Sequence, residues 1–400
     1  MATTLFTPVM GDSEVIVFDN NSDRLRKQED RKSQNTWGTV ELGDLHVEPI
    51  GEGTLPCVLD KARHDFNIGD EVTDEQLMET MSRNGTGLVV MVRQGGSRKG
   101  LLLRNCGLPS LRARARLAPC GLLDDYFKAR KLDKAAALIN QGLMEHPKRK
   151  SVFLESDKKL SGLHGNSYVP MEYVDMSKAD TQILDRDYPE WKLITSEMSH
   201  ASAHTMYALN SKELLDSFNL LCRRTGIDFE GDPYLITSTS DIADNGSDIR
   251  AYIKCERTGT IIPLGSPQVV PHIRNAADNM RRYKENLGSL ANVYRDSMET
   301  FERLSTITLN YPVDVMMWAG KALGFTQTVN GIKSLTPAFL AAVDDYTDHM
   351  GIVNTALDIY LALFNVQNDV ETIEKLIPNQ ATIIRALNFD WAGWDRPFSF

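Results

Sequence analysis

The hydrophobic pattern of the chain changes near Pro271, and this change narrows the possible folds to the mixed classes. Between Val152 and Val270 the apolar residues form short runs bounded by Gly, Pro, Asn or Asp, as in strands joined by turns. After Pro271 they recur at spacings of three, four and seven, which indicates amphipathic helices. The sequence therefore predicts an α+β fold: a mixed or antiparallel β core with interspersed helices, followed by a mainly helical C-terminal region.

Four regions follow from these patterns. Residues 1–45 are polar and carry mixed charge, so we expect a solvated N-terminal arm. Residues 46–150 are expected to form an N-terminal α+β region, residues 151–272 a β-rich core, and residues 273–400 a helical C-terminal region. No apolar run reaches the roughly 18 residues that a membrane span needs, and the first residues lack the pattern of a secretion signal.

Particular segments predict particular elements. Helices are expected at 73–83, 122–142 and 211–226, and one long helix at 275–305, with shorter helices after it. Strands are expected at 87–93, 100–105, 111–118, 151–156, 166–174, 191–198, 204–210, 233–240 and 248–257. In a strand at 111–118, the three alternating arginines would all leave from one face.

Positive charge is concentrated in one segment of an acidic chain. Between Arg93 and Lys159 there are sixteen Lys and Arg against six Asp and Glu, whereas the whole chain carries 44 basic and 54 acidic residues. Such asymmetry indicates a surface for phosphates or other polyanions. The residues predicted to form this basic strip are Arg98, Lys99, Arg104, Arg112, Arg114, Arg116, Lys128, Arg130, Lys131, Lys134, Lys148, Arg149 and Lys150.

Two hypotheses explain the strip. In the first, it binds nucleic acid such as single-stranded DNA, in a non-enzymatic protein of replication or recombination that holds or anneals strands. In the second, it pairs with the acidic helical region of a neighbouring subunit in a phage structural or host-interaction protein. That region has nine acidic and four basic residues from Gly331 onward. Both hypotheses predict a homo-oligomer.

The stretch from Tyr234 to Gly288 resembles the central block of a phage- and prophage-encoded family catalogued as a phage/plasmid-like domain of unknown function. The matching features are a strand at 234–240, Ser247 and Arg250 in the turn and second strand, and His272 before a long helix. The resemblance covers roughly residues 150–300. It departs after the first strand, where the family usually has an Asn-Ser-His-Asp-Gly-like turn and this chain has Ser238 to Asp241 and a late Gly246. The resemblance implies a mobile-element origin, in the host cytoplasm or the virion.

A second predicted site lies at the start of the long helix. His272, Arg274 and Asn275 stand where backbone N–H groups favour an anion, although structural capping explains the same residues. The predicted long helix begins directly after them. These three residues are therefore an anion-site candidate beside the basic strip.

The sequence gives no positive argument for catalysis or for a cofactor. His200 and His204 have the spacing of zinc ligands on a helix, but no third ligand follows them at a recognisable distance. The carboxylates and lysine between Asp185 and Lys192 are explained by a solvent-facing loop. The five cysteines form no Cys-x-x-Cys pair, which favours a reducing cytoplasm. We therefore expect no catalytic residues, no metal and no cofactor.

Overall fold

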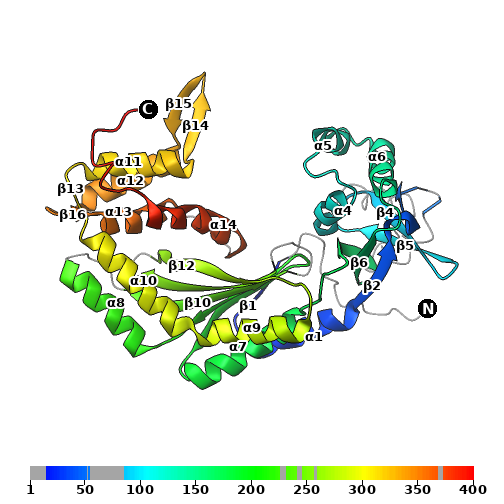
Figure 1. The fold of residues 1–400 in the computed structure, drawn as a ribbon, viewed down its shortest axis with the longest axis horizontal. Helices are drawn as coiled ribbons and strands as arrows, with labels where there is room; N and C mark the ends of the chain where they lie inside the picture. The colour runs from blue at the N-terminus through cyan, green and yellow to red at the C-terminus, as the bar shows by residue number, and fades with distance from the viewer. Residues whose placement is uncertain are drawn as a thin grey trace, which may run out of the picture.

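The computed structural model describes residues 15–51, 53–54, 85–225, 231–240, 246–255, 259–367 and 373–400. Across these residues it confirms the predicted α+β class, with antiparallel and mixed sheets and a helical C-terminal region. Figure 1 shows three units: an N-terminal unit, a central unit and a C-terminal unit. The two outer units rise from opposite ends of the central unit, on the same side of its sheet.

The sheet of the N-terminal unit has the strand order β2-β6-β7-β5-β4-β3, and only the β5–β7 pair is parallel. Its strands are β2 (Asn35–Glu41), β3 (Leu45–Pro49), β4 (Leu88–Gln94), β5 (Ser97–Leu103), β6 (Lys150–Ser156) and β7 (Lys159–Gly165). A single 3-10 turn separates β2 from β3 along the chain, although they form opposite edges of the sheet. The sheet must therefore curl, and the Gln94 amide on β4 donates to the Thr39 carbonyl on β2 at 3.1 Å.

Three helices cover one face of this sheet: α4 (Leu108–Arg114), α5 (Gly121–Lys128) and α6 (Leu132–Met144). Leu111 and Ile139 on these helices are fully buried in one apolar cluster with Leu101 on β5. Asn140 on α6 accepts from the backbone N–H of Val47 at 2.7 Å and donates to its carbonyl at 2.8 Å. Because Val47 lies on an edge strand, the Asn140 amide takes the place of a further strand there.

The central sheet is antiparallel in every pair, with the order β1-β8-β9-β10-β11-β12. Its strands are β1 (Ile16–Phe18), β8 (Lys192–Met198), β9 (Ala203–Ala208), β10 (Gly231–Thr239), β11 (Ser247–Cys255) and β12 (Ile261–Val270). One face is covered by α7 (Tyr173–Asp187), α8 (Lys212–Thr225), α9 (Ala276–Gly288) and α10 (Leu290–Ser305), as Figure 1 shows. Leu235 and Ile253 of the sheet pack there against Phe218 and Leu287 of the helices.

A buried polar network crosses this layer of helices. The carboxylate of Asp180 on α7 accepts hydrogen bonds from Tyr283 on α9 at 2.6 Å, Thr237 on β10 at 2.8 Å and Tyr207 on β9 at 2.9 Å. The guanidinium of Arg24 donates to the Tyr207 hydroxyl at 2.5 Å. Burial raises the pKa of Asp180, and the hydroxyl donors and the Arg24 charge oppose that rise. With the helix that carries Arg24, the network joins five elements.

The C-terminal unit packs on the end of the central unit, and one of its helices reaches the other face of the central sheet. Its elements are β13 (Thr308–Leu309), α11 (Pro312–Leu323), β14 (Thr326–Val329), β15 (Ile332–Leu335), α12 (Pro337–His349), β16 (Asn354–Thr355), α13 (Ala356–Ala362) and α14 (Ile373–Ile383). Ile373 on α14 packs with Met206, Ile236 and Tyr252 of the sheet. The Glu197 carboxylate accepts from the Ile373 backbone N–H at 2.9 Å, which fixes the start of α14.

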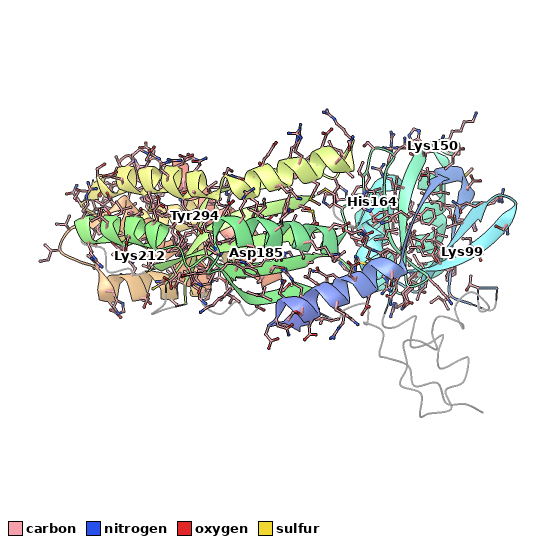
Figure 2. The ribbon with its side chains drawn as sticks, turned by 90° about the horizontal axis from the view of Figure 1, so that it is seen from below. Lys99, Lys150, His164, Asp185, Lys212 and Tyr294 are labelled. Atoms are coloured by element: carbon pink, nitrogen blue, oxygen red, sulfur yellow. The ribbon has the colours of Figure 1, made fainter. Side chains whose placement is uncertain are left out.

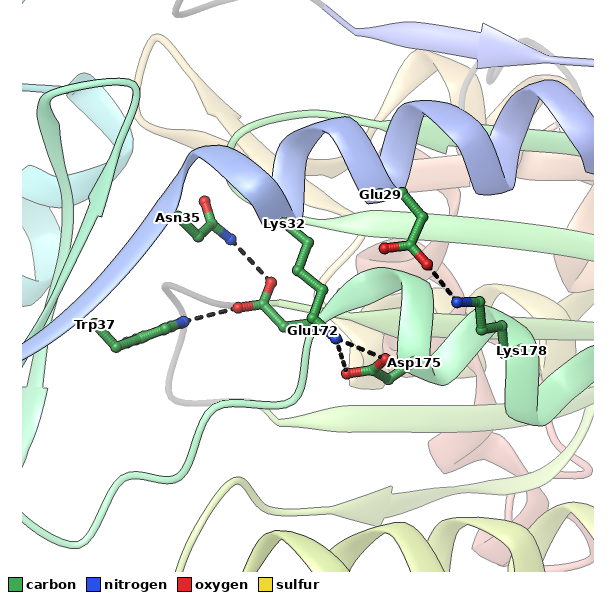
Figure 3. A network of polar contacts seen from close by, with 7 residues as sticks. All are labelled: Glu29, Lys32, Asn35, Trp37, Glu172, Asp175 and Lys178. Atoms are coloured by element: carbon green, nitrogen blue, oxygen red, sulfur yellow. Dashed lines mark hydrogen bonds and ion pairs between the residues drawn. The ribbon is translucent and has the colours of Figure 1, made fainter.

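Residues 15–45 do not form the expected solvated arm. Helix α1 (Asn21–Gln34) joins the two sheets, because β1 before it belongs to the central sheet and β2 after it to the N-terminal sheet. Its mixed charges are explained by contacts with α7: Lys32 binds Asp175 and Lys178 binds Glu29 (Figure 3). Residues 1–14 lie outside the described part of the chain.

Several other expectations need correction. The segment 111–118 is helical up to Arg114 and is no strand. Residues 166–172 form a loop, and α7 begins at Tyr173. The expected helix at 122–142 is two helices, broken where Arg130 has a positive φ of 52°, and the long helix is broken at Ser289. Strands β6 and β7 complete the N-terminal sheet, so the expected boundary at residue 150 falls inside that sheet. The expected helix at 73–83 lies outside the described residues.

Candidate nucleic-acid interface

The three alternating arginines do not share a strand face. Arg112 and Arg114 lie in the last turn of α4, and Arg116 follows that helix with a φ of 57°. The Arg112 guanidinium donates to the Asp124 carboxylate on α5 at 2.7 Å and is four-fifths buried. Since 100° of helical rotation separates consecutive residues, these guanidinium groups point in different directions. The predicted arginine face therefore does not exist.

Two further cations of the predicted strip have structural roles. Arg104 is fully buried, and its guanidinium lies 3.4 Å from the Ser156 carbonyl and 4.0 Å from the Asp157 carboxylate. Lys99 pairs with the nearly buried carboxylate of Glu155 at 2.5 Å. Both contacts hold β5 to the β6–β7 hairpin. The sequence assigned these two positive charges to a ligand-binding surface, but in the structure they form contacts within the fold.

The remaining cations of the strip are distributed over three places. Arg98 lies next to the tip of the β4–β5 hairpin. At the corner between α5 and α6 lies a second group, which we call the corner cluster: Lys128, Arg130, Lys131 and Lys134. The third group lies where β6 begins, and we call it the Lys150 cluster: Arg114, Arg116, Lys148, Arg149 and Lys150. Because α6 is 13 residues long, it separates the last two groups by about 20 Å.

The Lys150 cluster is assembled by tertiary contacts. Lys150 opens β6, and the next residue pairs with Gly165 at the end of β7. The Arg114 guanidinium packs against Gly165, where an added Cβ would be 3.4 Å from its Nη1 atom. The α4 carboxyl end reaches α6 in the same region, because Ala115 lies against Gly142. Residues 147–149 accept backbone hydrogen bonds from Leu42 and Gly43, so the loop that carries Lys148 and Arg149 is held in place.

Lys148, Arg149, Lys150 and Arg116 are exposed, and within the described part of the chain none of them has an ion pair. Two carboxylates lie nearby: Glu41 is opposite Lys150 in the β2–β6 ladder, and Glu145 caps the end of α6. The cluster therefore has an excess of positive charge at one edge of the unit. Figure 2 shows Lys150 on a different side of the unit from Lys99.

Beside this cluster lies an aromatic stack that sequence reasoning missed. The ring of Tyr168 stacks on His164 with centroids 3.9 Å apart and on Trp37 at 5.5 Å. The Tyr168 N–H donates to the Gly165 carbonyl, so the stack begins next to the residue that Arg114 contacts. Trp37 and Tyr168 are half-buried. No pattern in the sequence marks them, because strand pairing alone brings residues 37, 164 and 168 together.

The Trp37 ring is held in place from the central unit. Its indole N–H donates to one carboxylate oxygen of Glu172 at 2.8 Å, and the Asn35 amide donates to the other at 2.9 Å. Figure 3 shows this carboxylate between β2 and the start of α7. Glu172 therefore couples the aromatic stack to the orientation of the two sheets.

The predicted anion site at residues 272–275 is corrected. His272 is buried, with Nε2 2.8 Å from the Ser247 hydroxyl and Nδ1 3.1 Å from the Tyr168 hydroxyl. Burial lowers its pKa to about 4, with a smaller contribution from His164. The Asn275 side chain caps α9 by accepting from the Ala277 N–H at 2.8 Å. Arg274 is exposed and lies beside Ser167, whose carbonyl accepts from its backbone N–H.

The candidate metal ligands of the sequence form hydrogen bonds or ion pairs with other residues of the fold. His204 lies on a strand, with its ring nitrogens 2.9 Å from the Ser238 hydroxyl and 3.0 Å from the Ser202 hydroxyl, while His200 is buried in the preceding turn. They are therefore not on one helix face. Asp185 accepts from the Trp191 indole, and Asp187 pairs with Arg186. Within the described ranges no group of three or more His, Cys, Asp or Glu residues could hold a metal ion.

Comparison of the chain with models of known families, with curated proteins and with solved structures finds no significant match. The resemblance to the phage/plasmid-like family therefore stays a prediction. Among the described residues no helix is long and apolar enough to cross a membrane.

Proposed function

We propose that the protein binds single-stranded nucleic acid, without sequence preference, along the Lys150 cluster and the adjoining aromatic stack. The observation that carries the proposal is the meeting of these two features at Gly165. Cations attract the phosphate backbone and release its counterions, and aromatic rings stack bases of any sequence. Arg274, next to the same connection, extends the positive charge toward α9.

The corner cluster supports this choice by contrast. It has four basic residues, but Tyr126 and Phe127, the nearest aromatics in sequence, pack against the core of the N-terminal unit. A site that depended on charge alone would use both clusters equally. A site that also stacks bases would use the Lys150 cluster.

The experiment compares two triple variants that remove the same charge. Arg116→Gln/Arg149→Gln/Lys150→Gln changes the Lys150 cluster, and Lys128→Gln/Lys131→Gln/Lys134→Gln changes the corner cluster. Binding of fluorescent oligo(dT) of about 16 nucleotides is measured by anisotropy from about 50 to about 200 mM salt. The first variant is expected to weaken binding and to reduce the slope of log K against log salt by about 0.7 per lost contact.

The corner variant is expected to change the affinity by less than about twofold. Equal losses in the two variants would mean that charge alone attracts the oligonucleotide, and absence of wild-type binding at the lower salt would refute the proposal. A duplex of the same length measures the preference for single strands. Annealing of two complementary labelled strands tests whether binding also serves recombination.

A further inference from the structure

A groove runs between α7 and α9 on the outer side of the central unit. It has a volume of about 970 Å³, with Ile183 and Met280 in its apolar part and Arg186, Arg281, Lys284 and Glu285 among its polar residues. Figure 2 shows the two helices side by side, with Asp185 on α7 marking one of them. Arg186 pairs with Asp187 and Arg281 pairs with Glu285, so the groove presents apolar surface beside two paired arginines and the ammonium group of Lys284.

The groove cations keep donors for another partner. Lys284 donates to the Gln182 amide oxygen at 2.9 Å and has no ion pair within the described residues. Arg281 binds Glu285 at 2.7 Å and lies 3.8 Å from Asp278, but it is 60% exposed. Exposed ion pairs of this kind contribute little to stability, so another carboxylate can readily replace one of the partners. An incoming carboxylate can therefore bind Lys284 directly and share Arg281.

A surface of complementary character lies on the C-terminal unit. Leu340, Asp344 and Asp348 are exposed on α12 at intervals of four residues, which places them on one helix face. The loop after this helix exposes Ile352 completely and Val353 by 67%. We call these five residues the Ile352 knob. Asp344 and Asp348 have no ion pair in the part of the chain that the structure describes.

Within one chain, the knob and the groove lie on opposite sides of the central sheet. Helices α7 and α9 lie along the outer side of the central sheet, whereas α12 belongs to the unit that rises from the opposite side (Figure 1). Two adjacent exposed aliphatic side chains next to two carboxylates match a groove whose apolar floor lies beside Lys284 and the exposed guanidinium of Arg281. We infer that the groove receives the Ile352 knob of a second copy of this chain.

This contact is heterologous, since two different surfaces meet. A heterologous contact repeats from copy to copy and forms either a closed ring or a filament. The contact uses none of the residues of the Lys150 cluster or the aromatic stack, so assembly would line up one nucleic-acid site per subunit. The inference stands on its own surfaces and is tested without nucleic acid.

The test exchanges charges between the two surfaces of nuclease-treated protein. The groove variant is Arg281→Glu/Lys284→Glu, and the knob variant is Asp344→Lys/Asp348→Lys. Sedimentation velocity over a range of protein concentrations measures association. Each variant alone is expected to associate at least about tenfold more weakly than the wild type. A mixture of the two variants should recover association, because opposite charges then face each other. The quadruple variant, which carries all four substitutions in one chain, should recover it for the same reason.

Circular dichroism is used to check that each variant is folded. The variant Ile352→Asp/Val353→Asp gives a second test that leaves the groove intact. This variant is also expected to lose association. A wild type that stays monomeric at every concentration overturns the inference, as does a mixture that fails to recover. A groove variant that assembles normally but binds oligo(dT) more weakly overturns it too, and assigns the groove to nucleic acid.

Discussion

Helix α7 forms polar contacts on two sides, and these contacts are buried on one side and exposed on the other. On its inner side Asp180 is buried and accepts from three hydroxyl groups. On its outer side Asp175 and Lys178 form ion pairs with α1, and their side chains are about half exposed. The inner side connects α7 to α9 and to the sheet, and the outer side connects it to α1. The comparison teaches that burial, more than the number of charges, decides which contacts determine stability.

The physical reason is the cost of leaving a buried group without a partner. Water replaces either member of the Lys32–Asp175 pair when the other is removed. No water reaches the three hydroxyl groups around Asp180 without rearrangement of the helices. The inner network therefore fixes where α7 and α9 sit on the sheet, and the outer pairs adjust how α1 lies on α7. This division leads to four predictions.

The largest effect is expected for Asp180→Ala. The substitution leaves the hydroxyls of Tyr207, Thr237 and Tyr283 without their common acceptor, and it removes the carboxylate charge that lies near the Arg24 guanidinium. The free energy of unfolding should fall by about 3–5 kcal/mol, measured by urea denaturation. Asp185→Ala on the same helix is the control, with an expected loss below about 1 kcal/mol. Similar losses for the two variants would contradict the distinction between buried and exposed contacts.

A smaller effect is expected from acid, through a buried group on the same face of the sheet. His272 has its pKa lowered to about 4 by burial, below the ordinary value of 6.5. Between these values the unfolded chain binds the proton and the folded chain does not, so stability is present above pH 6.5 and falls toward pH 4. The loss should reach about 1–3 kcal/mol. Urea denaturation of His272→Gln should show a shallower pH dependence, and an unchanged one would contradict this assignment.

Glu172 is expected to have an intermediate effect, because its partners are only half-buried. Glu172→Ala removes the acceptor of the Trp37 indole and the Asn35 amide, which should cost about 1–2 kcal/mol. The same change should weaken oligo(dT) binding, because the Trp37 ring loses its fixed position in the stack. Glu172→Gln keeps one carbonyl acceptor and should show smaller losses in both measurements. Undiminished oligo(dT) binding by Glu172→Ala would separate the stack from the nucleic-acid site.

The smallest effect is expected for the outer ion pairs. Lys32→Ala should lower the free energy of unfolding by about 0–1 kcal/mol, and added salt should reduce the difference further. A double-mutant cycle with Asp175→Ala isolates the coupling of the pair. A coupling larger than that of the inner network would reverse the comparison.

Local patterns predicted much of the fold. The strands at 87–93, 151–156, 191–198 and 233–240, and helix α8, lie where hydrophobic periodicity places them, and α11 and α12 are among the shorter helices expected after residue 305. Strand β12 was missed because Pro263 and Pro267 interrupt its pattern. It is an edge strand, where a missing N–H is tolerated. The strand expected at 166–174 failed because an apolar alternation near Pro170 also fits an irregular lead into a helix.

The candidate site was predictable only in part. Local charge pointed to the segment that contains Arg149 and Lys150, but it also included Arg104, which is buried, and Arg112, which pairs with Asp124. Whether a cation has a partner depends on residues brought near it by folding. The aromatic residue Trp37 lay in a region expected to be a solvated arm, so its role could not be predicted.

The sequence by itself determined the fold class and the excess of positive charge in the N-terminal unit, because both depend on composition and short-range periodicity. Only the tertiary structure decided which cations remain exposed and that residues 37, 164 and 168 stack beside Lys150. The same holds for the acceptor shared by Tyr207, Thr237 and Tyr283. The reason is that ion pairing, burial and stacking act between side chains whose distance is set by strand order and helix packing. The local sequence around a residue does not determine those distances.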